Sequence, residues 1–300
     1  MARLKSEQIT KGDLLEYLDS YSDFSFELSV LKMLRERNIE CAHGGHYDDP
    51  VTNKSREFDI RAAKTIDNSD AGKASKRVRL AIECKNIRDN FPILISCIPR
   101  QEEESHHEIA FVIEPNIISR IAVMSLQESR ANTVSLRGSH SLYKLNEPVG
   151  KSTVQVGRAL DSSISFNDSE LYEKWGQCLS SANDLVKRIY WDGERSKVAY
   201  LSAVFPFVVV PNGRLWMVIY DEDGNRISDP TPTDRVSCFI NKSYRMGTNT
   251  AGATMQISHV EVVTFDGMTA FVDRYLNSEM AEIFPILGIG EAYMRDTEED

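Results

Sequence analysis

Two short segments of the sequence hold side chains that can do chemistry together. Residues 56–61 read Arg-Glu-Phe-Asp-Ile-Arg, and residues 79–85 read Arg-Leu-Ala-Ile-Glu-Cys-Lys. Both patterns are typical of β-strands, in which successive side chains point to opposite faces. Asp59, Glu83 and Lys85 are therefore expected to converge on the non-core face of two paired strands. Carboxylate oxygens at this density suit Mg²⁺ or Mn²⁺. The adjacent lysine is placed to hold or polarise an attacking water.

The strand alternation also predicts which side chains are buried. On the second segment one face collects Val78, Leu80, Ile82 and Cys84, and the other collects Arg79, Ala81, Glu83 and Lys85. On the first segment, Phe58 and Ile60 are expected to face away from Asp59.

A third carboxylate lies on an expected helix. Phe24, Leu28, Leu31 and Leu34 recur at helical spacing, and Glu27 falls on the same stripe. A carboxylate that faces inward is costly unless it is paired or binds a cation. Glu27 is therefore expected to join the same metal site.

The order of these parts resembles the PD-(D/E)XK nuclease superfamily, which has the restriction-endonuclease-like fold. That family carries an Asp and a Glu-x-Lys on adjacent strands, often with a Glu on the preceding helix. Phe58 stands where the family's name has proline, a departure that leaves the ligands intact. The alternative is that Glu83 and Lys85 form a surface pair on a strand, with Asp59 and Glu27 unrelated to it.

The resemblance implies roles for particular residues. Asp59, Glu83, the backbone carbonyl of Cys84 and Glu27 would hold Mg²⁺ or Mn²⁺. Lys85 would orient the attacking water and offset developing negative charge.

The implied fold is α/β, with a restriction-endonuclease-like mixed central sheet flanked by helices. We expect one domain over residues 1–300, with a core at about 11–220, an irregular insertion at about 90–157 and a C-terminal elaboration at about 221–300. Helices are expected at 11–37, 167–191 and 268–276, and strands at 39–47, 56–66, 77–86, 108–113, 200–210, 215–220 and 259–265. Asn167 and Glu170 predict the start of the long helix, and Gly193 its end. Pro211-Asn212-Gly213 predicts a hairpin between the strands beside it.

Basic and polar side chains near the site are candidates for contact with nucleic acid. They are Lys73, Lys76, Arg77, Arg79 and Arg88 around the second strand, and Lys151, Gln155 and Arg158 in the insertion. Gln177, on the polar side of the long helix, is expected to support the site from beside it. The alternative for each group is a solvated loop or helix face.

Other features point away from competing classes of protein. The five cysteines show no Cys-x-x-Cys spacing and are expected to be reduced thiols. Cys41, His43 and His46 lack the further ligands of a zinc site, and Gly150-Lys-Ser lacks the earlier glycine of a P-loop. His106-His107 lies among glutamates and is expected to form an exposed polar turn. No signal peptide or membrane span is evident, so a cytoplasmic location is expected.

The resemblance therefore implies a Mg²⁺-dependent nuclease that hydrolyses phosphodiester bonds. DNA is the favoured substrate, endonuclease action is favoured, and restriction or antiphage defence is the implied context. The net charge of −10 opposes simple non-specific DNA binding. It favours help in substrate delivery from a partner protein or a homo-oligomer. It also supports an alternative, a catalytically silent binding or regulatory subunit on a nuclease-like scaffold.

Overall fold

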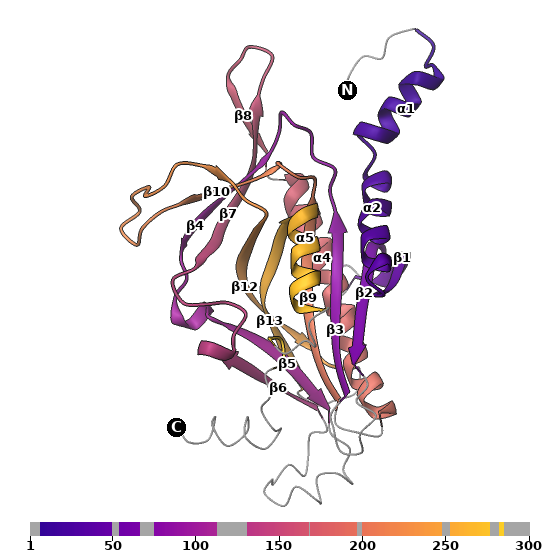
Figure 1. The fold of residues 1–300 in the computed structure, drawn as a ribbon, viewed down its shortest axis with the longest axis vertical. Coiled ribbons are helices and arrows are strands. Elements are labelled where there is room, and N and C mark those ends of the chain that lie inside the picture. The colour runs from indigo at the N-terminus through magenta and orange to yellow at the C-terminus, as the bar shows by residue number, and fades with distance from the viewer. Residues whose placement is uncertain are drawn as a thin grey trace, which may run out of the picture.

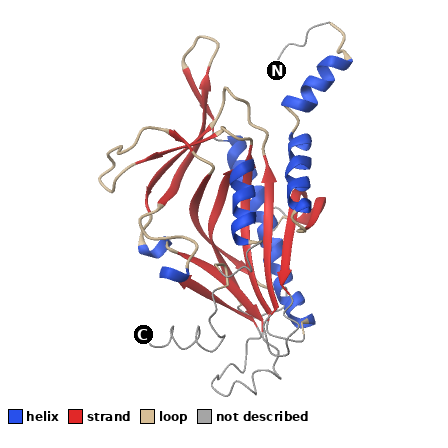
Figure 2. Cartoon of the chain, in the orientation of Figure 1, coloured by secondary structure: helices blue, strands red, loops and turns tan. Residues whose placement is uncertain are grey.

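A long twisted sheet forms the body of the protein, and helices cover both of its faces (Figures 1 and 2). The structure is a computed structural model. It describes residues 7–49, 54–66, 75–112, 131–167, 169–196, 200–247, 253–276 and 282–284.

The described helices are α1 (Lys11–Ser20), α2 (Asp23–Glu36), α4 (Ser169–Arg195) and α5 (Phe265–Tyr275). The strands are β1 (Glu40–Asp48), β2 (Ser55–Ile66), β3 (Ser75–Cys84), β4 (Ile93–Pro99), β5 (His106–Val112), β6 (Ala131–Arg137), β7 (Pro148–Arg158), β8 (Ile164–Asn167), β9 (Tyr200–Val210), β10 (Leu215–Ile219), β11 (Thr231–Pro232), β12 (Arg235–Arg245) and β13 (Thr254–Thr264). Their order in the described sheet is β1-β2-β3-β9-β13-β12-β7-β4-β10-β11, with β5, β6 and β8 attached beside this path.

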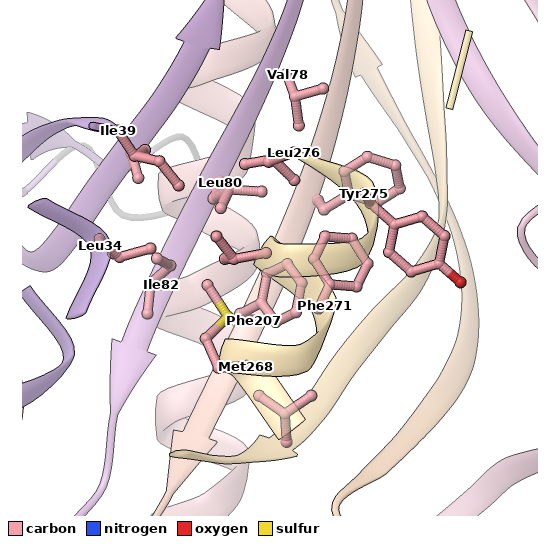
Figure 3. Packing of buried hydrophobic residues seen from close by; sticks show 14 of the residues in the cluster. Leu34, Ile39, Val78, Leu80, Ile82, Phe207, Met268, Phe271, Tyr275 and Leu276 are labelled. Carbon is pink, nitrogen blue, oxygen red and sulfur yellow. The ribbon is translucent and has the colours of Figure 1, made fainter. Parts of the chain in front are cut away.

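Strand β3 is buried on both of its faces. Leu80 and Ile82 pack with α2 and α5, where Leu34 and Phe271 belong to the same apolar cluster (Figure 3). Ala81, on the opposite face, packs with apolar side chains of α4. The sequence alternation is therefore confirmed for β3, but the face expected to lie away from the core is covered by α4.

The strands around the candidate site form a mixed arrangement. β1, β2 and β3 are consecutive antiparallel neighbours, and β3 pairs in parallel with β9. Cys84 lies opposite Val209, so the C-terminal ends of β3 and β9 lie side by side at the same end of the sheet. The α/β class and the mixed central sheet are confirmed.

The sequence predicts that segment 90–157 is irregular apart from a strand at 108–113. The strand is confirmed by β5, but the irregular character is wrong. The described residues of this segment supply β4, β5, β6 and β7, and all four belong to the large sheet. The later strands β12 and β13 lie inside the sheet, where β13 is the parallel neighbour of β9. The proposed division into core, insertion and elaboration stays a prediction.

The predicted hairpin between β9 and β10 is wrong, although the turn forms. Arg214 N donates to Pro211 O at 3.3 Å, and Gly213 adopts a φ of 74°. β9 already has β3 and β13 as neighbours, so both of its edges are occupied there. β10 instead crosses the molecule and pairs in parallel with β4.

The predicted helix end at Gly193 is also wrong, because α4 continues to Arg195. A Cβ atom at Gly193 would lie 2.5 Å from Val112 Cβ, so the glycine lets α4 approach β5 closely. At the other end of α4, Asn167 is the last residue of β8, and the side chain of Glu170 lies outside what the structure describes, so the expected capping stays a prediction.

His106 and His107 do not form an exposed turn. Both are buried in β5, and His106 Nε2 lies 3.1 Å from Glu108 Oε1. Ser258 Oγ donates to Glu108 Oε2 at 3.1 Å, and it lies 2.8 Å from His259 Nδ1. These side chains form a buried polar network between β5 and β13.

No helix in the described ranges has both the length and the apolar character needed to cross a lipid bilayer.

The close approach at Gly193 yields a test of α4 packing. Gly193→Ala is expected to lower the melting temperature, because its methyl group overlaps Val112; overpacking of this kind costs about 1–3 kcal/mol. Gly176→Ala on the same helix is the matched control, since nothing lies within 4 Å of a Cβ there. That change is expected to stabilise the protein by about 0.5–1 kcal/mol through helix propensity. Equal shifts in both variants, measured by thermal unfolding, would contradict the packing.

Candidate active site

Two carboxylates from adjacent strands meet under helix α4. Lys174 Nζ, on α4, donates to Asp59 Oδ2 of β2 at 2.8 Å and to Glu83 Oε2 of β3 at 3.2 Å. Asp59 Oδ2 also accepts a hydrogen bond from the backbone N–H of Cys84 at 2.8 Å. The structure thus brings Asp59 and Glu83 together, as expected, and one ammonium group joins them.

That ammonium belongs to Lys174, so the prediction that Lys85 meets the two carboxylates is wrong. Lys85 follows the last residue of β3, and its Nζ lies 3.8 Å from Asp23 Oδ2 at the start of α2. Lys174 lies three residues before Gln177 and one helical turn before Cys178, which is buried against β3. Residues four apart share a helix face, so the spacing of Lys174 from the apolar Cys178 was the sequence feature that could have placed Lys174 toward β3.

The carboxylate of Glu83 is fully buried and incompletely paired. Burial and the nearby charge of Asp59 raise its pKa from 4.5 to about 8, against the opposing effect of Lys174. Its Oε1 atom has no hydrogen-bond partner. Burial disfavours the charged form of Lys174, but the charges of Glu83 and Asp59 prevail and raise its pKa.

Glu27 approaches the same place from α2. Its Oε2 lies 3.1 Å from His43 Nε2 of β1, and its side chain is 14% exposed. Burial and the charge of Asp59 raise the pKa of Glu27, while the contact with His43 opposes the change. The inward orientation of Glu27 is confirmed. Phe24 and Leu28, expected on the buried stripe, are instead exposed.

Phe58 does not share the environment of Ile60. The Ile60 side chain lies in the apolar cluster with α2. The Phe58 ring lies 4.1 Å from the guanidinium carbon of Arg61, which donates to Asp184 and Ser181 of α4. The expected alternation is therefore wrong at Phe58, which packs against an arginine held by α4.

The carboxylate oxygens of Asp59 and Glu83 are the type of ligand that a hard divalent cation prefers. Oε1 of buried Glu83 has no hydrogen-bond partner, so its lone pairs can coordinate a cation. Across the described ranges no three His, Cys, Asp or Glu side chains stand together as a ready ligand group. The positive charge between the two carboxylates is that of Lys174.

The basic residues of β3 do not form one rim. Arg79 is buried, and it bonds Ser202, Tyr200 and Asp192, because α4 covers its face. Arg77 pairs with Glu40 at 3.1 Å, and the neighbouring Lys76 is half-buried. A strand rises about 3.3 Å per residue, so Arg77 and Lys85 are separated by roughly 26 Å. Lys73 lies outside the described residues.

Arg88, Gln155 and Arg158 do come together. With Lys85 they line a cleft of ≈ 460 Å³ at the end of β3. Gln155 is buried and donates to Phe91 O at 3.3 Å, so its amide is already engaged.

Two other candidate residues, Lys151 and Gln177, do not line this cleft. Lys151 bonds Glu104 and lies 5.5 Å from the ring of Phe239. Gln177 is half-buried on the site helix, and its carbonyl accepts from Tyr47 Oη at 3.1 Å.

Comparison with protein-family models, with curated proteins and with solved structures finds no match to this chain.

The raised pKa of Glu83 predicts how stability depends on pH in the absence of metal. The folded state holds this proton more tightly than the unfolded state, so stability falls as pH rises from 4.5 to about 8. The loss is on the order of 2–5 kcal/mol, because one pKa unit corresponds to about 1.36 kcal/mol.

Glu83→Gln is expected to remove this loss, since the amide does not titrate. The measurement is chemical unfolding in EDTA across this range, with exposed Glu36→Gln as the control. A wild-type pH dependence in Glu83→Gln would show that Glu83 is not the titrating group.

Proposed function

We propose that this protein is a metal-dependent phosphodiesterase, an endonuclease with DNA as its favoured substrate. The observation that carries the proposal is the meeting of buried Glu83 with Asp59 beneath Lys174. One ammonium does not compensate both carboxylates, so the pKa of buried Glu83 is raised; a divalent cation would allow both Glu83 and Asp59 to be ionised.

The order of the elements supports a restriction-endonuclease-like fold. Helix α2 precedes the antiparallel strands β1, β2 and β3, and α4 then leads into β9, which lies parallel to β3. Asp59 and Glu83 lie on the second and third of these strands, and Glu27 lies on the preceding helix. This is the arrangement that the resemblance to the PD-(D/E)XK superfamily implies.

Mg²⁺ or Mn²⁺ would be held by Asp59, Glu83 and the carbonyl of Cys84, with Glu27 as a direct or water-mediated ligand. When bound, such an ion polarises a phosphate and lowers the pKa of water. The chain itself supplies the positioning: β2 and β3 fix the two carboxylates, and the Cys84 N–H holds Asp59 in place. Lys85, at the cleft, orients the attacking water beside the phosphate.

The two lysines have different proposed roles, and substitution separates them. Lys85→Ala is expected to lower cleavage by about 10²-fold or more, because a charge aimed at the transition state is lost. It should leave the melting temperature in EDTA nearly unchanged. Lys174→Ala is expected to lower that melting temperature, because Asp59 and Glu83 lose their shared cation. Mg²⁺ should restore much of the lost stability.

The assay is plasmid cleavage with Mg²⁺ and with Mn²⁺, beside thermal unfolding and with exposed Lys32→Ala as the control. Full activity in Lys85→Ala together with none in folded Lys174→Ala would move the catalytic role to Lys174.

Metal binding provides a second test. Mg²⁺ should raise the melting temperature of the wild-type protein, because a ligand that binds only the folded state stabilises it. Asp59→Asn and Glu83→Gln should each weaken binding by about tenfold or more, since each removes a formal charge. Glu27→Gln should reduce the Mg²⁺-induced shift less, while preserving or raising stability without metal. Exposed Asp229→Asn is the control. Equal shifts in all variants would place the ion elsewhere.

The alternative proposal is a catalytically silent binding or regulatory subunit on the same scaffold, acting in a complex. The net charge of −10 favours this alternative. Metal-dependent cleavage by the purified protein, lost in Glu83→Gln, would exclude it. The resemblance also implies a role in restriction or antiphage defence. We include in the proposal a cytoplasmic location and a partner, either another protein or a second copy of this chain.

A further inference from the structure

A cleft opens beside the candidate active site where three parts of the chain meet. Tyr21 and Asp23 line it from the junction of α1 and α2, and Lys85 lines it from the end of β3. Arg158 and Ser165 line it from the β7–β8 hairpin. Figure 1 shows α1 and this hairpin projecting at the same end of the molecule. The cleft measures ≈ 460 Å³, within the range of sites that hold small ligands.

The cleft is cationic on an acidic protein. Its charged lining consists of Lys85, Arg88 and Arg158 against Asp23, so +3 and −1 give +2. The whole chain carries −10. Among the described residues neither Arg88 nor Arg158 forms an ion pair with an acid. Arg158 Nη1 donates to the carbonyl of Ser162 at 2.9 Å, which leaves its other donors for an anion.

Two aromatic residues, Tyr21 and Phe91, also line the cleft. The guanidinium carbon of Arg88 lies 4.8 Å from the ring centroid of Tyr21, which is 41% exposed. Phe91 N donates to Arg88 O at 3.1 Å, so both residues belong to one turn. A Cβ atom at Gly157 would lie 2.6 Å from Phe91 Cδ2, so this glycine makes room for the ring. The lining therefore combines aromatic side chains with net positive charge.

Rings and cations in this combination recognise unpaired nucleotides. A base can stack on an aromatic side chain only when the face of the base is not covered by neighbouring bases, as it is in a duplex. The phosphates meanwhile pair with Arg and Lys. We propose that the cleft binds a single-stranded stretch of nucleic acid. An unpaired base stacks on Tyr21 or Phe91, and the flanking phosphates contact Lys85, Arg88 and Arg158.

Binding of a single strand in this cleft would specify the substrate of the proposed nuclease, and the substrate preference given below rests on that proposed function. Lys85 lines the cleft two residues after Glu83, so a strand bound at Lys85 passes roughly 7 Å along β3 from the carboxylate pair. A duplex with a flap, gap or melted segment is then a better substrate than an intact duplex.

Binding is tested without cleavage, in EDTA, by fluorescence anisotropy. The probes are a labelled single-stranded DNA oligonucleotide, the same strand in a blunt duplex, and the RNA of the same sequence, which tells the two sugars apart. The single strand is expected to bind about tenfold or more tightly than the duplex. Tyr21→Ala should weaken single-strand binding by roughly tenfold, the scale of one stacked base. Arg88→Ala and Arg158→Ala should each weaken it and reduce the salt dependence by about one counterion.

Arg245→Ala is the matched control. Arg245 is exposed and pairs with Thr254, ten residues before Thr264 at the end of β13, so it lies roughly 33 Å from the site's edge of the sheet. Equal binding of the single strand and the duplex would overturn the inference. So would equal losses in Arg88→Ala and Arg245→Ala.

The two proposals can also fail separately. Single-strand binding that depends on the cleft, without any cleavage in Mg²⁺, would sink the nuclease and keep the inference. Cleavage with binding unaffected by the cleft variants would do the reverse.

Discussion

The burial of the Glu83 carboxylate beside Asp59 is the constraint on which the site depends. A charged carboxylate is costly in an apolar interior unless a cation compensates it. Lys174 supplies one positive charge to two negative ones, and Oε1 of Glu83 remains without a partner. The raised pKa of Glu83 expresses that imbalance. A protein that only needed a stable core would pair these groups fully or replace them, so the imbalance favours a functional explanation.

Helix α4 must lie in one position for this arrangement to exist, and polar contacts along its length hold it there. Arg61 donates to Asp184 at 2.7 Å, and Arg79 bonds Asp192 near the C-terminal end of the helix. Closer to the site, Tyr47 Oη donates to the carbonyl of Gln177. Arg79, which looked suited to nucleic acid in the sequence, thus has a structural role. It fixes the helix that carries Lys174 over the two strands.

Local sequence pattern identified the two strand carboxylates and the inward Glu27, although Phe24, Leu28 and Phe58 depart from the same patterns. The alternation in β3 correctly predicted that Leu80 and Ile82 lie on the face opposite Glu83. Helical spacing correctly predicted that Glu27 faces inward. Neither pattern showed what covers the polar face of β3, because that is decided by α4, about 90 residues further along the chain. Lys174 was missed for that reason.

The same limit explains the errors in the fold. The turn at Pro211-Asn212-Gly213 was identified, but the partner of β10 was not, because β3 and β13 occupy both edges of β9. The strand at 108–113 was predicted and matches β5, but β4, β6 and β7 of segment 90–157 were not predicted, since the four prolines of the segment are typical of irregular chain. Pro99 and Pro148 in fact lie at the ends of β4 and β7, where they pair with each other. Proline is tolerated at strand ends, so its presence there is no argument against a strand.

The distribution of charge connects the fold to the proposed chemistry. A chain with a charge of −10 repels polyanions over most of its surface, and ions in solution screen that repulsion beyond about 10 Å. Attraction then acts where cations are concentrated, and the cleft at the end of β3 is such a place. A net charge of −10 discourages non-specific binding along a duplex, while a cationic cleft attracts a strand whose phosphates reach into it. On the proposed function, the acidic surface thus restricts where nucleic acid binds, and the lining of the cleft restricts which form of it reaches Asp59 and Glu83.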